Sequence, residues 1–342
     1  MRSFCSLPLL AVVFLSLLPI SLSAQSKENW APRRFVGETL SVDVDVVDVY
    51  FTVRKHNKFV ENLTKDDFEI RENNRKQDIR YFSSESQARL SLGVLIDTSD
   101  SESPMLHSER EIARRFFNTV LAPGDEGFVA SFDSNIQIRQ DFTGDHESLV
   151  KAIELSDKNS SERSRSIDPG PMPKDRSTAL YDAIVGISEH RFADRRGRNA
   201  VIIITDGQDA GSRATAKQAI NAALKANAIC YVLLVGDKGY MSSTSYVGGE
   251  RMRYLAGETG GRVVVLDHKL KGLESSLLEI AAELRHHYSI GYSPEDRNAD
   301  GAYRRLSIRS HHGYQVHSRR GYFYVPREPN EPEASLLGAA SQ

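Results

Sequence analysis

Five oxygen-bearing side chains, at three separated places in the sequence, have the types needed to hold a divalent cation. Asp97, Ser99 and Ser101 share one short segment, Thr178 begins Thr-Ala-Leu-Tyr-Asp, and Asp206 stands within Thr-Asp-Gly. Carboxylate and hydroxyl oxygens are hard ligands, and a site built from oxygen alone suits Mg²⁺ or Mn²⁺. Ser99 and Ser101 are two positions apart, so both hydroxyls can point into one loop. These residues together predict one metal site.

Strongly apolar runs lead directly into two of these segments. Residues 92–96 are Leu-Gly-Val-Leu-Ile and lead to Asp97, and residues 201–205 are Val-Ile-Ile-Ile-Thr and lead to Asp206. Apolar, β-branched runs of this length predict buried parallel strands. Open α/β sheets bind ligands just beyond the carboxyl ends of such strands. We therefore expect Asp97 and Asp206 to lie together at one edge of a sheet.

Strand and helix patterns alternate between these two runs and after them. Alternation of this kind predicts an α/β fold with a doubly wound, mostly parallel sheet. Residues 136–142 alternate in polarity and should form an antiparallel edge strand, whereas residues 156–177 are polar and predict a long loop beside the metal edge. That loop either contacts a partner or is only a connection. The expected helices are 105–121, 146–155, 179–192, 215–227, 250–259 and 270–287.

The order of the metal-site segments resembles that of a known family. Asp-x-Ser-x-Ser, then a Thr, then Thr-Asp-Gly are similar to the metal-ion-dependent adhesion site (MIDAS) of von Willebrand factor A (VWA) domains. This resemblance covers roughly residues 88–290 and implies the Rossmann-like VWA sheet. The flanks, through Leu-Thr-Lys-Asp-Asp-Phe-Glu at 63–69 and Tyr-Ser-Ile-Gly-Tyr at 288–292, resemble a bacterial branch of secreted VWA-related proteins, best represented in acidobacteria.

The resemblance also implies a role for each site residue. Ser99 and Ser101 would bind the ion through their hydroxyls, and Thr178 would approach directly or through water. Asp97 and Asp206 would act through bound waters and hydrogen bonds to those hydroxyls. Mg²⁺ keeps bound waters readily, and an ion without a directly coordinated carboxylate stays electrophilic. It would then take an Asp or Glu of a protein partner as its remaining ligand.

Other acidic residues lie near these segments. Asp97 and Asp206 could instead cap helices or turns, although that alternative explains five converging residues poorly. Asp100 lies between the two serines and adds negative charge to the rim. Asp182 is expected on the exposed start of its helix, and Asp209 is expected either to support the ligands or to lie on the surface. The helix after the serines begins at the ion, and its N-terminus favours a negatively charged ligand.

Both ends of the chain differ from the α/β part. The 342 residues include a positively charged start and an apolar stretch over residues 1–24, which predict a secretory signal peptide and therefore a secreted or periplasmic protein. An uncleaved membrane anchor is the alternative. The formal net charge of −2 does not suggest a nucleic-acid binder. Cys230 is the one cysteine after residue 24, so no internal disulfide is expected, and its apolar surroundings predict a small buried side chain.

Five segments follow from these patterns. Residues 40–82 and 288–325 are β-rich and bracket the α/β part, so we expect them to form one small β-sandwich with the VWA domain inserted; independent flanks are the alternative. The expected segments are a signal peptide at 1–24, an N-terminal β module at 25–87, a VWA domain at 88–287, a C-terminal β segment at 288–326 and a disordered tail at 327–342.

We expect a binding protein and not an enzyme. The sequence contains neither His-Glu-x-x-His nor Gly-x-Ser-x-Gly, and no histidine base accompanies Ser99. The adjacent pairs His286-His287 and His311-His312 are expected to have surface or packing roles. The interpretation is an exported, cation-dependent module for protein binding or cell adhesion, which binds an acidic residue of its partner and spans no membrane after signal cleavage. The alternatives are a structural scaffold in an envelope complex without metal-dependent binding and, less in keeping with the motifs, a metal-assisted hydrolase.

Overall fold

The chain divides into two units, Met1–Asp43 and Val44–Gln342. All residues that the structure describes belong to the second unit. The predicted signal peptide, the predicted tail and Ser101 lie outside the described residues. Within the described part, no helix combines the length and apolarity needed to cross a membrane. The computed structural model describes residues 46–84, 89–99, 104–154, 165–167, 178–193, 195, 197–235, 243–267, 269–296, 298 and 301–324.

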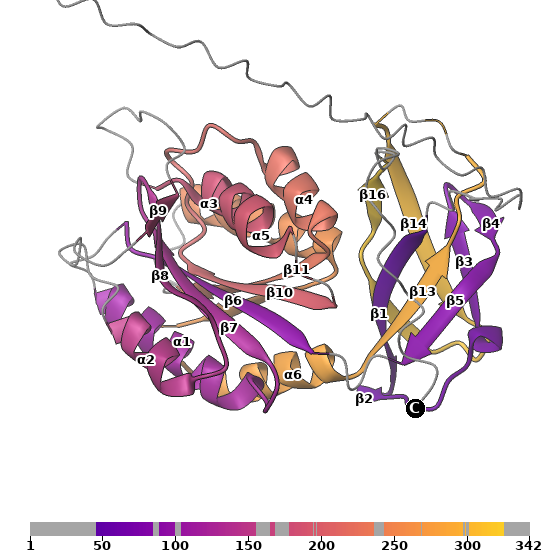
Figure 1. The fold of residues 1–342 in the computed structure, drawn as a ribbon, viewed down its shortest axis with the longest axis horizontal. Coiled ribbons are helices and arrows are strands. Elements are labelled where there is room, and N and C mark those ends of the chain that lie inside the picture. The colour runs from indigo at the N-terminus through magenta and orange to yellow at the C-terminus, as the bar shows by residue number, and fades with distance from the viewer. Residues whose placement is uncertain are drawn as a thin grey trace, which may run out of the picture. The chain divides into compact units, whose positions relative to one another are not determined.

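A seven-stranded sheet forms the centre of the α/β part, in the order β12-β11-β10-β6-β7-β8-β9 (Figure 1). β6 pairs in parallel with β7 on one side and with β10 on the other, so the strand order reverses at β6. The predicted mixed α/β architecture is confirmed. The strands are β6 (Leu90–Asp97), β7 (Glu126–Phe132), β8 (Ile136–Thr143), β9 (Arg165–Ile167), β10 (Arg198–Thr205), β11 (Ala228–Val235) and β12 (Val263–Leu266).

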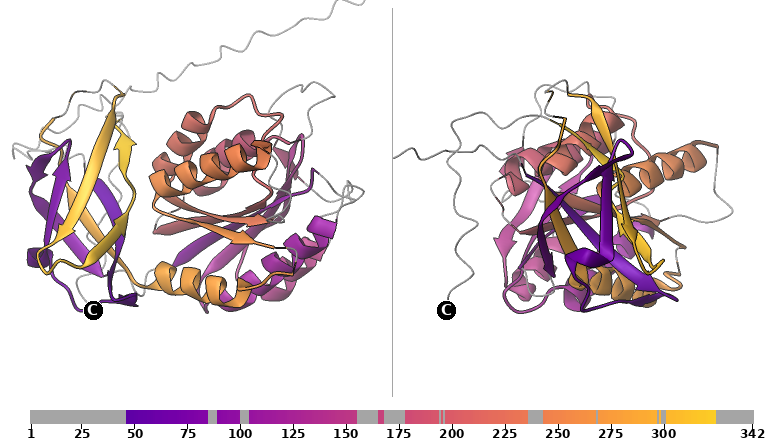
Figure 2. Two further views of the ribbon diagram at one scale, coloured as in Figure 1. Left: turned by 180° about the vertical axis from the view of Figure 1, so that it is seen from behind. Right: turned by 90° about the vertical axis from the view of Figure 1, so that its right-hand side faces the viewer.

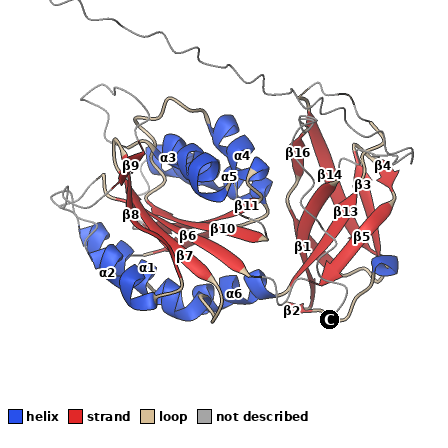
Figure 3. Cartoon of the chain, viewed as in Figure 1, coloured by secondary structure: helices blue, strands red, loops and turns tan. Residues whose placement is uncertain are grey.

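Helices cover both faces of this sheet (Figures 1 and 3). One face packs against α1, α2 and α6, and the other against α3, α4 and α5. α3 continues directly into a π-helical turn, η2. The helices are α1 (Pro104–Val120), α2 (His146–Glu154), α3 (Leu180–Ile187), η2 (Ser188–Phe192), α4 (Ala216–Lys225), α5 (Ser243–Thr259) and α6 (Leu273–Arg285).

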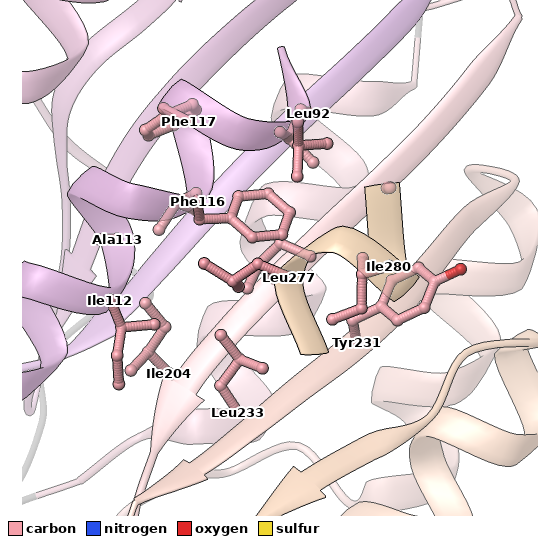
Figure 4. Close-up of a cluster of buried hydrophobic side chains, with 14 of the residues drawn as sticks. Leu92, Ile112, Ala113, Phe116, Phe117, Ile204, Tyr231, Leu233, Leu277 and Ile280 are labelled. Carbon is pink, nitrogen blue, oxygen red and sulfur yellow. The ribbon is translucent and has the colours of Figure 1, made fainter. Parts of the chain in front are cut away.

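The period-two alternation of the central strands divides their side chains between two cores. Leu92 and Ile96 of β6 belong to the core beneath α1 and α6, whereas Leu95 belongs to the core beneath α3 to α5. Phe116 of α1 and Leu277 of α6 lie together in the first core, and both are fully buried (Figure 4). Because both faces are buried, the central strands have the continuous apolar sequences that made them recognisable.

Two features of the α/β part differ from the prediction. β8 is antiparallel to β7, as expected, but it is not the edge, because β9 pairs antiparallel outside it within the predicted loop 156–177. The sequence of β9 is Arg-Ser-Ile, which is too short and polar to give a strand pattern. α5 begins at Ser243, although the helix was predicted from Glu250. The Gly248-Gly249 pair obscured the first turns, because adjacent glycines usually weaken a helix.

A second group of strands combines residues from both flanks of the α/β part (Figure 2). β1 pairs antiparallel with β13 and β15, and β3 pairs antiparallel with β14, so each of the two sheets contains strands from both flanking segments. The sheets share one hydrophobic core, which includes Phe51, Ile70 and Ile290. The elements are β1 (Val47–Lys55), β2 (Lys58–Phe59), η1 (Lys65–Asp67), β3 (Phe68–Glu72), β4 (Arg75–Gln77), β5 (Ile79–Ser84), β13 (His287–Tyr292), β14 (Tyr303–Ser310), β15 (Gln315–Ser318) and β16 (Gly321–Phe323).

Candidate metal site

The register of two central strands places the two predicted carboxylates side by side. Ile96 of β6 is the partner of Ile204 of β10, so Asp97 and Asp206 follow at the same edge of the sheet. The Thr205 hydroxyl donates a hydrogen bond of 2.7 Å to Asp97 Oδ2. This edge is also where the strand order reverses, the position at which open α/β sheets bind ligands.

Asp97 is a buried carboxylate whose negative charge is only partly compensated. Its side chain is 6% exposed, and the Ser99 amide donates a hydrogen bond of 3.1 Å to Oδ1. Burial, with a smaller contribution from the nearby charge of Asp206, raises the pKa of Asp97 to about 6 against the opposing effect of hydrogen bonds from Thr205 and Ser99. A cation at this edge would offset the desolvation and the repulsion together.

Asp206 is held by the tight turn that follows β10. The Gln208 amide and the Gln208 side chain donate hydrogen bonds of 2.8 Å to its two carboxylate oxygens, and the side chain is half-buried. Gly207 has φ of +83°, a conformation that favours glycine, and its amide donates to the Thr205 hydroxyl at 3.0 Å. The Thr-Asp-Gly sequence therefore fixes the direction of the Asp206 carboxylate.

Thr178 reaches the same edge from a different loop. Its carbonyl accepts a hydrogen bond of 3.2 Å from Ala210, in the loop after β10. The next residue, Ala179, donates at 2.7 Å to the carbonyl of Asp133, in the turn after β7. The buried Thr178 is thus fixed between the loops that follow two strands of the sheet. The structure brings Asp97, Ser99, Thr178 and Asp206 to one edge, and Ser101 falls outside the described residues.

Two other aspartates bind the loop after β10 to the start of α3. Asp182 is 9% exposed and accepts hydrogen bonds from the amides of Arg213 and Ala214, so the prediction of an exposed position was wrong. Asp209 accepts a hydrogen bond of 3.0 Å from the amide of Leu180. Both carboxylates therefore position the segments that carry Thr178 and Asp206. The sequence held no signal for this, because each contact joins residues about thirty positions apart.

The donor set fits a hard divalent cation. Its described members offer two carboxylates and two hydroxyls, which are ligands typical of Mg²⁺ or Mn²⁺ and not of softer metals. Among the described residues, no group of three or more His, Cys, Asp or Glu side chains is placed to hold a metal. Any ion at this edge would therefore depend on the hydroxyl oxygens. His286 and His287 do not form a ligand pair, because His286 stacks on Phe59 while His287 is buried.

A close crossing of two glycines holds α5 against the Asp206 turn. A Cβ atom added to Gly248 would lie 2.5 Å from the carbonyl oxygen of Gly207, whereas one added to Gly249 would meet only side-chain atoms of Leu234 and Arg253, at 3.5 Å. We expect Gly248→Ala to destabilise the fold by about 1–3 kcal/mol, because the overlap involves backbone that can yield only by moving the turn. The matched variant Gly249→Ala should be neutral or more stable, since alanine favours helix. Urea unfolding of both variants measures this, and equal losses would contradict it.

Comparisons with known proteins add the following. No family model and no curated protein matches the chain. Among solved structures, the chain is similar to the conserved hypothetical protein BatB from Bacteroides thetaiotaomicron, with 16% identity over 57% of this chain and 98% of that one and a TM-score of 0.42. It is also similar to the von Willebrand factor type A protein from Catenulispora acidiphila, with 12% identity, coverage of 76% and 74%, and a TM-score of 0.44. A third is the mussel byssus proximal thread matrix protein 1 with a zinc-occupied MIDAS motif, with 15% identity, coverage of 62% and 49%, and a TM-score of 0.41.

Proposed function

We propose that this chain is an exported protein-binding module that depends on a divalent cation. Asp97, Ser99, Ser101, Thr178 and Asp206 would hold Mg²⁺ or Mn²⁺, and an Asp or Glu of a protein partner would complete the shell of the ion. The observation that supports this most directly is the buried Asp97 beside the half-buried Asp206, whose charge repels it, at the point where the strand order reverses. A buried carboxylate beside a second one is costly unless a cation or a proton compensates it.

The surrounding residues would prepare the site before any ion arrives. Thr205 and the Ser99 amide orient Asp97, and Gln208 orients Asp206, so little rearrangement is needed on binding. The ion would supply an electrophile for a carboxylate of the partner. The predicted signal peptide supports a location outside the cytoplasm. A structural scaffold without metal-dependent binding remains the rival that the following experiment addresses.

We expect Asp206→Asn to weaken Mg²⁺ and Mn²⁺ binding by about 10- to 100-fold, because it removes one of two charges that attract the ion while keeping the side-chain shape. Isothermal titration calorimetry of the purified chain measures the affinity. The matched control is Glu189→Gln, which removes one charge from an exposed position in η2, just before the chain returns to the amino end of β10. The proposal fails if Asp206→Asn binds both cations as tightly as Glu189→Gln does.

A further inference from the structure

The helix α5 adjoins the candidate metal site at one end. Gly248 packs against Gly207, the residue that follows Asp206. Arg251, one turn further along, hydrogen-bonds the side chain of Tyr181, which lies three residues after Thr178. A partner group bound at the candidate metal site would therefore be close to the exposed Arg251 of α5.

The outer face of α5 exposes an aromatic ring between cationic groups. Met252, Leu255 and Ala256 are buried against the sheet, and the side chains left on the outside are those of Glu250, Arg251, Arg253 and Tyr254. Tyr254 is 54% exposed, an unusual exposure for so large a side chain. It is one of five large hydrophobic residues exposed in the described structure, and a second of these, Tyr303, lies close enough to Tyr254 to interact with it electrostatically.

The far end of α5 meets exposed basic residues. The side chain of Arg320 is 65% exposed and lies 3.9 Å from the buried carboxylate of Glu258, which also accepts a hydrogen bond from the Tyr303 hydroxyl. Tyr303 packs edge-on against Phe323, with ring centroids 5.0 Å apart, and exposed Lys217 lies 5.1 Å from the centre of that ring. Glu258 thus fixes Tyr303 and Arg320 in place while much of the guanidinium stays open to solvent.

We propose that Arg251, Tyr254, Tyr303 and Arg320, here called the α5 strip, bind a second acidic group of the same partner segment whose first acidic group occupies the metal site. The proposal rests on the proposed function for that first contact. Tyrosine and arginine are the side chains that most often dominate binding energy at interfaces. The exposed charges of the strip and of neighbouring Lys217 are positive, and the exposed carboxylate of Glu250 on the same helix is neutralised by its 2.8 Å ion pair with Arg253, so the net positive charge favours a partner with carboxylates.

The length of the strip sets the spacing of the acidic groups. From Gly248 to Gly257, beneath Arg320, α5 rises by roughly 14 Å at about 1.5 Å per residue. An extended peptide advances about 3.3 Å per residue, so roughly four residues cover this distance. The strip therefore fits an extended segment with two acidic residues about four positions apart and an apolar side chain between them against Tyr254.

The experiment uses capped, fluorescent peptides that contain one glutamate, or two glutamates two, four or eight positions apart in a serine–glycine background. Fluorescence anisotropy measures their affinity for the purified chain in Mg²⁺ and in chelator. The variants are Arg320→Glu in the strip and, as a matched control, Lys151→Glu, an exposed lysine on α2 at the opposite face of the sheet. Both substituted side chains are exposed, and Arg320→Glu also removes the cation beside the buried carboxylate of Glu258.

In Mg²⁺ we expect the peptide with a spacing of four to bind about tenfold more tightly than the single-glutamate peptide, because the second contact becomes intramolecular. Arg320→Glu should remove this advantage and Lys151→Glu should keep it. Three results would contradict the proposed role of the α5 strip. They are equal affinities for all peptides, no binding of any peptide, and an advantage of the four-residue spacing that survives Arg320→Glu. Binding that survives chelator but is lost in Arg320→Glu would support the strip and contradict the metal-dependent function.

Discussion

Glu72→Ala should destabilise the protein by about 3–5 kcal/mol, the cost of leaving a buried charge without its partner. Glu72 and Arg304 are each 3% exposed and form an ion pair of 3.2 Å between the neighbouring strands β3 and β14 of one sheet of the β part. The same carboxylate accepts hydrogen bonds from the hydroxyls of Tyr292, at 2.6 Å, and Tyr322, at 2.7 Å. The substitution removes all three contacts, so the two hydroxyls lose their acceptor and the buried guanidinium keeps only its bonds to the carbonyls of Asp296 and Asn298 and a distant contact with the Asp296 carboxylate.

The matched control lies on the same strand. Glu69 of β3 also pairs with an arginine, Arg71, at 2.6 Å, but on the partly exposed side where water screens the pair. Glu69→Ala should therefore cost only a small fraction of the loss seen for Glu72→Ala. Urea unfolding monitored by circular dichroism compares the two variants. Similar losses would show that the buried network contributes little beyond a surface pair.

The central sheet and the edge that carries the candidate site were predictable because apolar sequence continues almost to the end of β6 and β10. The strands ending at Asp97 and Thr205 are buried along their whole length, so the side chains in their central stretches, residues 92–96 and 200–204, are apolar on both faces. The polar residue that ends such a run marks the carboxyl edge directly. For this reason the expectation that Asp97 and Asp206 lie at one edge of the sheet followed from local pattern, whereas the direct pairing of β6 with β10 did not.

The contacts that hold this edge together were not predictable in the same way. Asp182 binds amides some thirty residues away, and Gly248 packs on Gly207 across a distance of forty-one positions. Such contacts depend on the path of the chain and leave no periodic signal near either residue. The Glu72–Arg304 pair is the extreme case, since 232 positions separate its members. Sequence patterns reported which elements form, while these polar contacts depend on how the elements meet.

The buried position of Asp97 implies that the candidate site lowers the stability of the cation-free protein. Burial raises the pKa of this carboxyl from 3.8 to about 6, so the folded state binds a proton more tightly than the unfolded state. The contribution of Asp97 to the stability of the folded state is therefore greatest below pH 4, where the carboxyl is protonated. This contribution is lost as the pH rises through 6. Above pH 6 the lost stability approaches about 3 kcal/mol, because each unit of pKa difference between the folded and unfolded states corresponds to about 1.4 kcal/mol.

We therefore expect Asp97→Asn to stabilise the protein by up to about 3 kcal/mol in chelator at pH 7.5, with the gain disappearing near pH 4, because asparagine keeps the shape without the charge. Added Mg²⁺ should stabilise the wild type and not the variant.

Asp125→Asn provides the opposite control in the same domain. Burial tends to raise the pKa of Asp125, but its bonds to Arg285 and to the amides of Leu90 and Ala122 outweigh burial and lower it. A lowered carboxyl pKa contributes stability that is present at neutral pH and is lost as the pH falls through the folded value. Asp125→Asn should accordingly destabilise the protein at pH 7.5, where Asp97→Asn stabilises it. Thermal unfolding in chelator at both pH values distinguishes the two, and a destabilised Asp97→Asn at pH 7.5 would show that Asp97 holds the fold together without any cation.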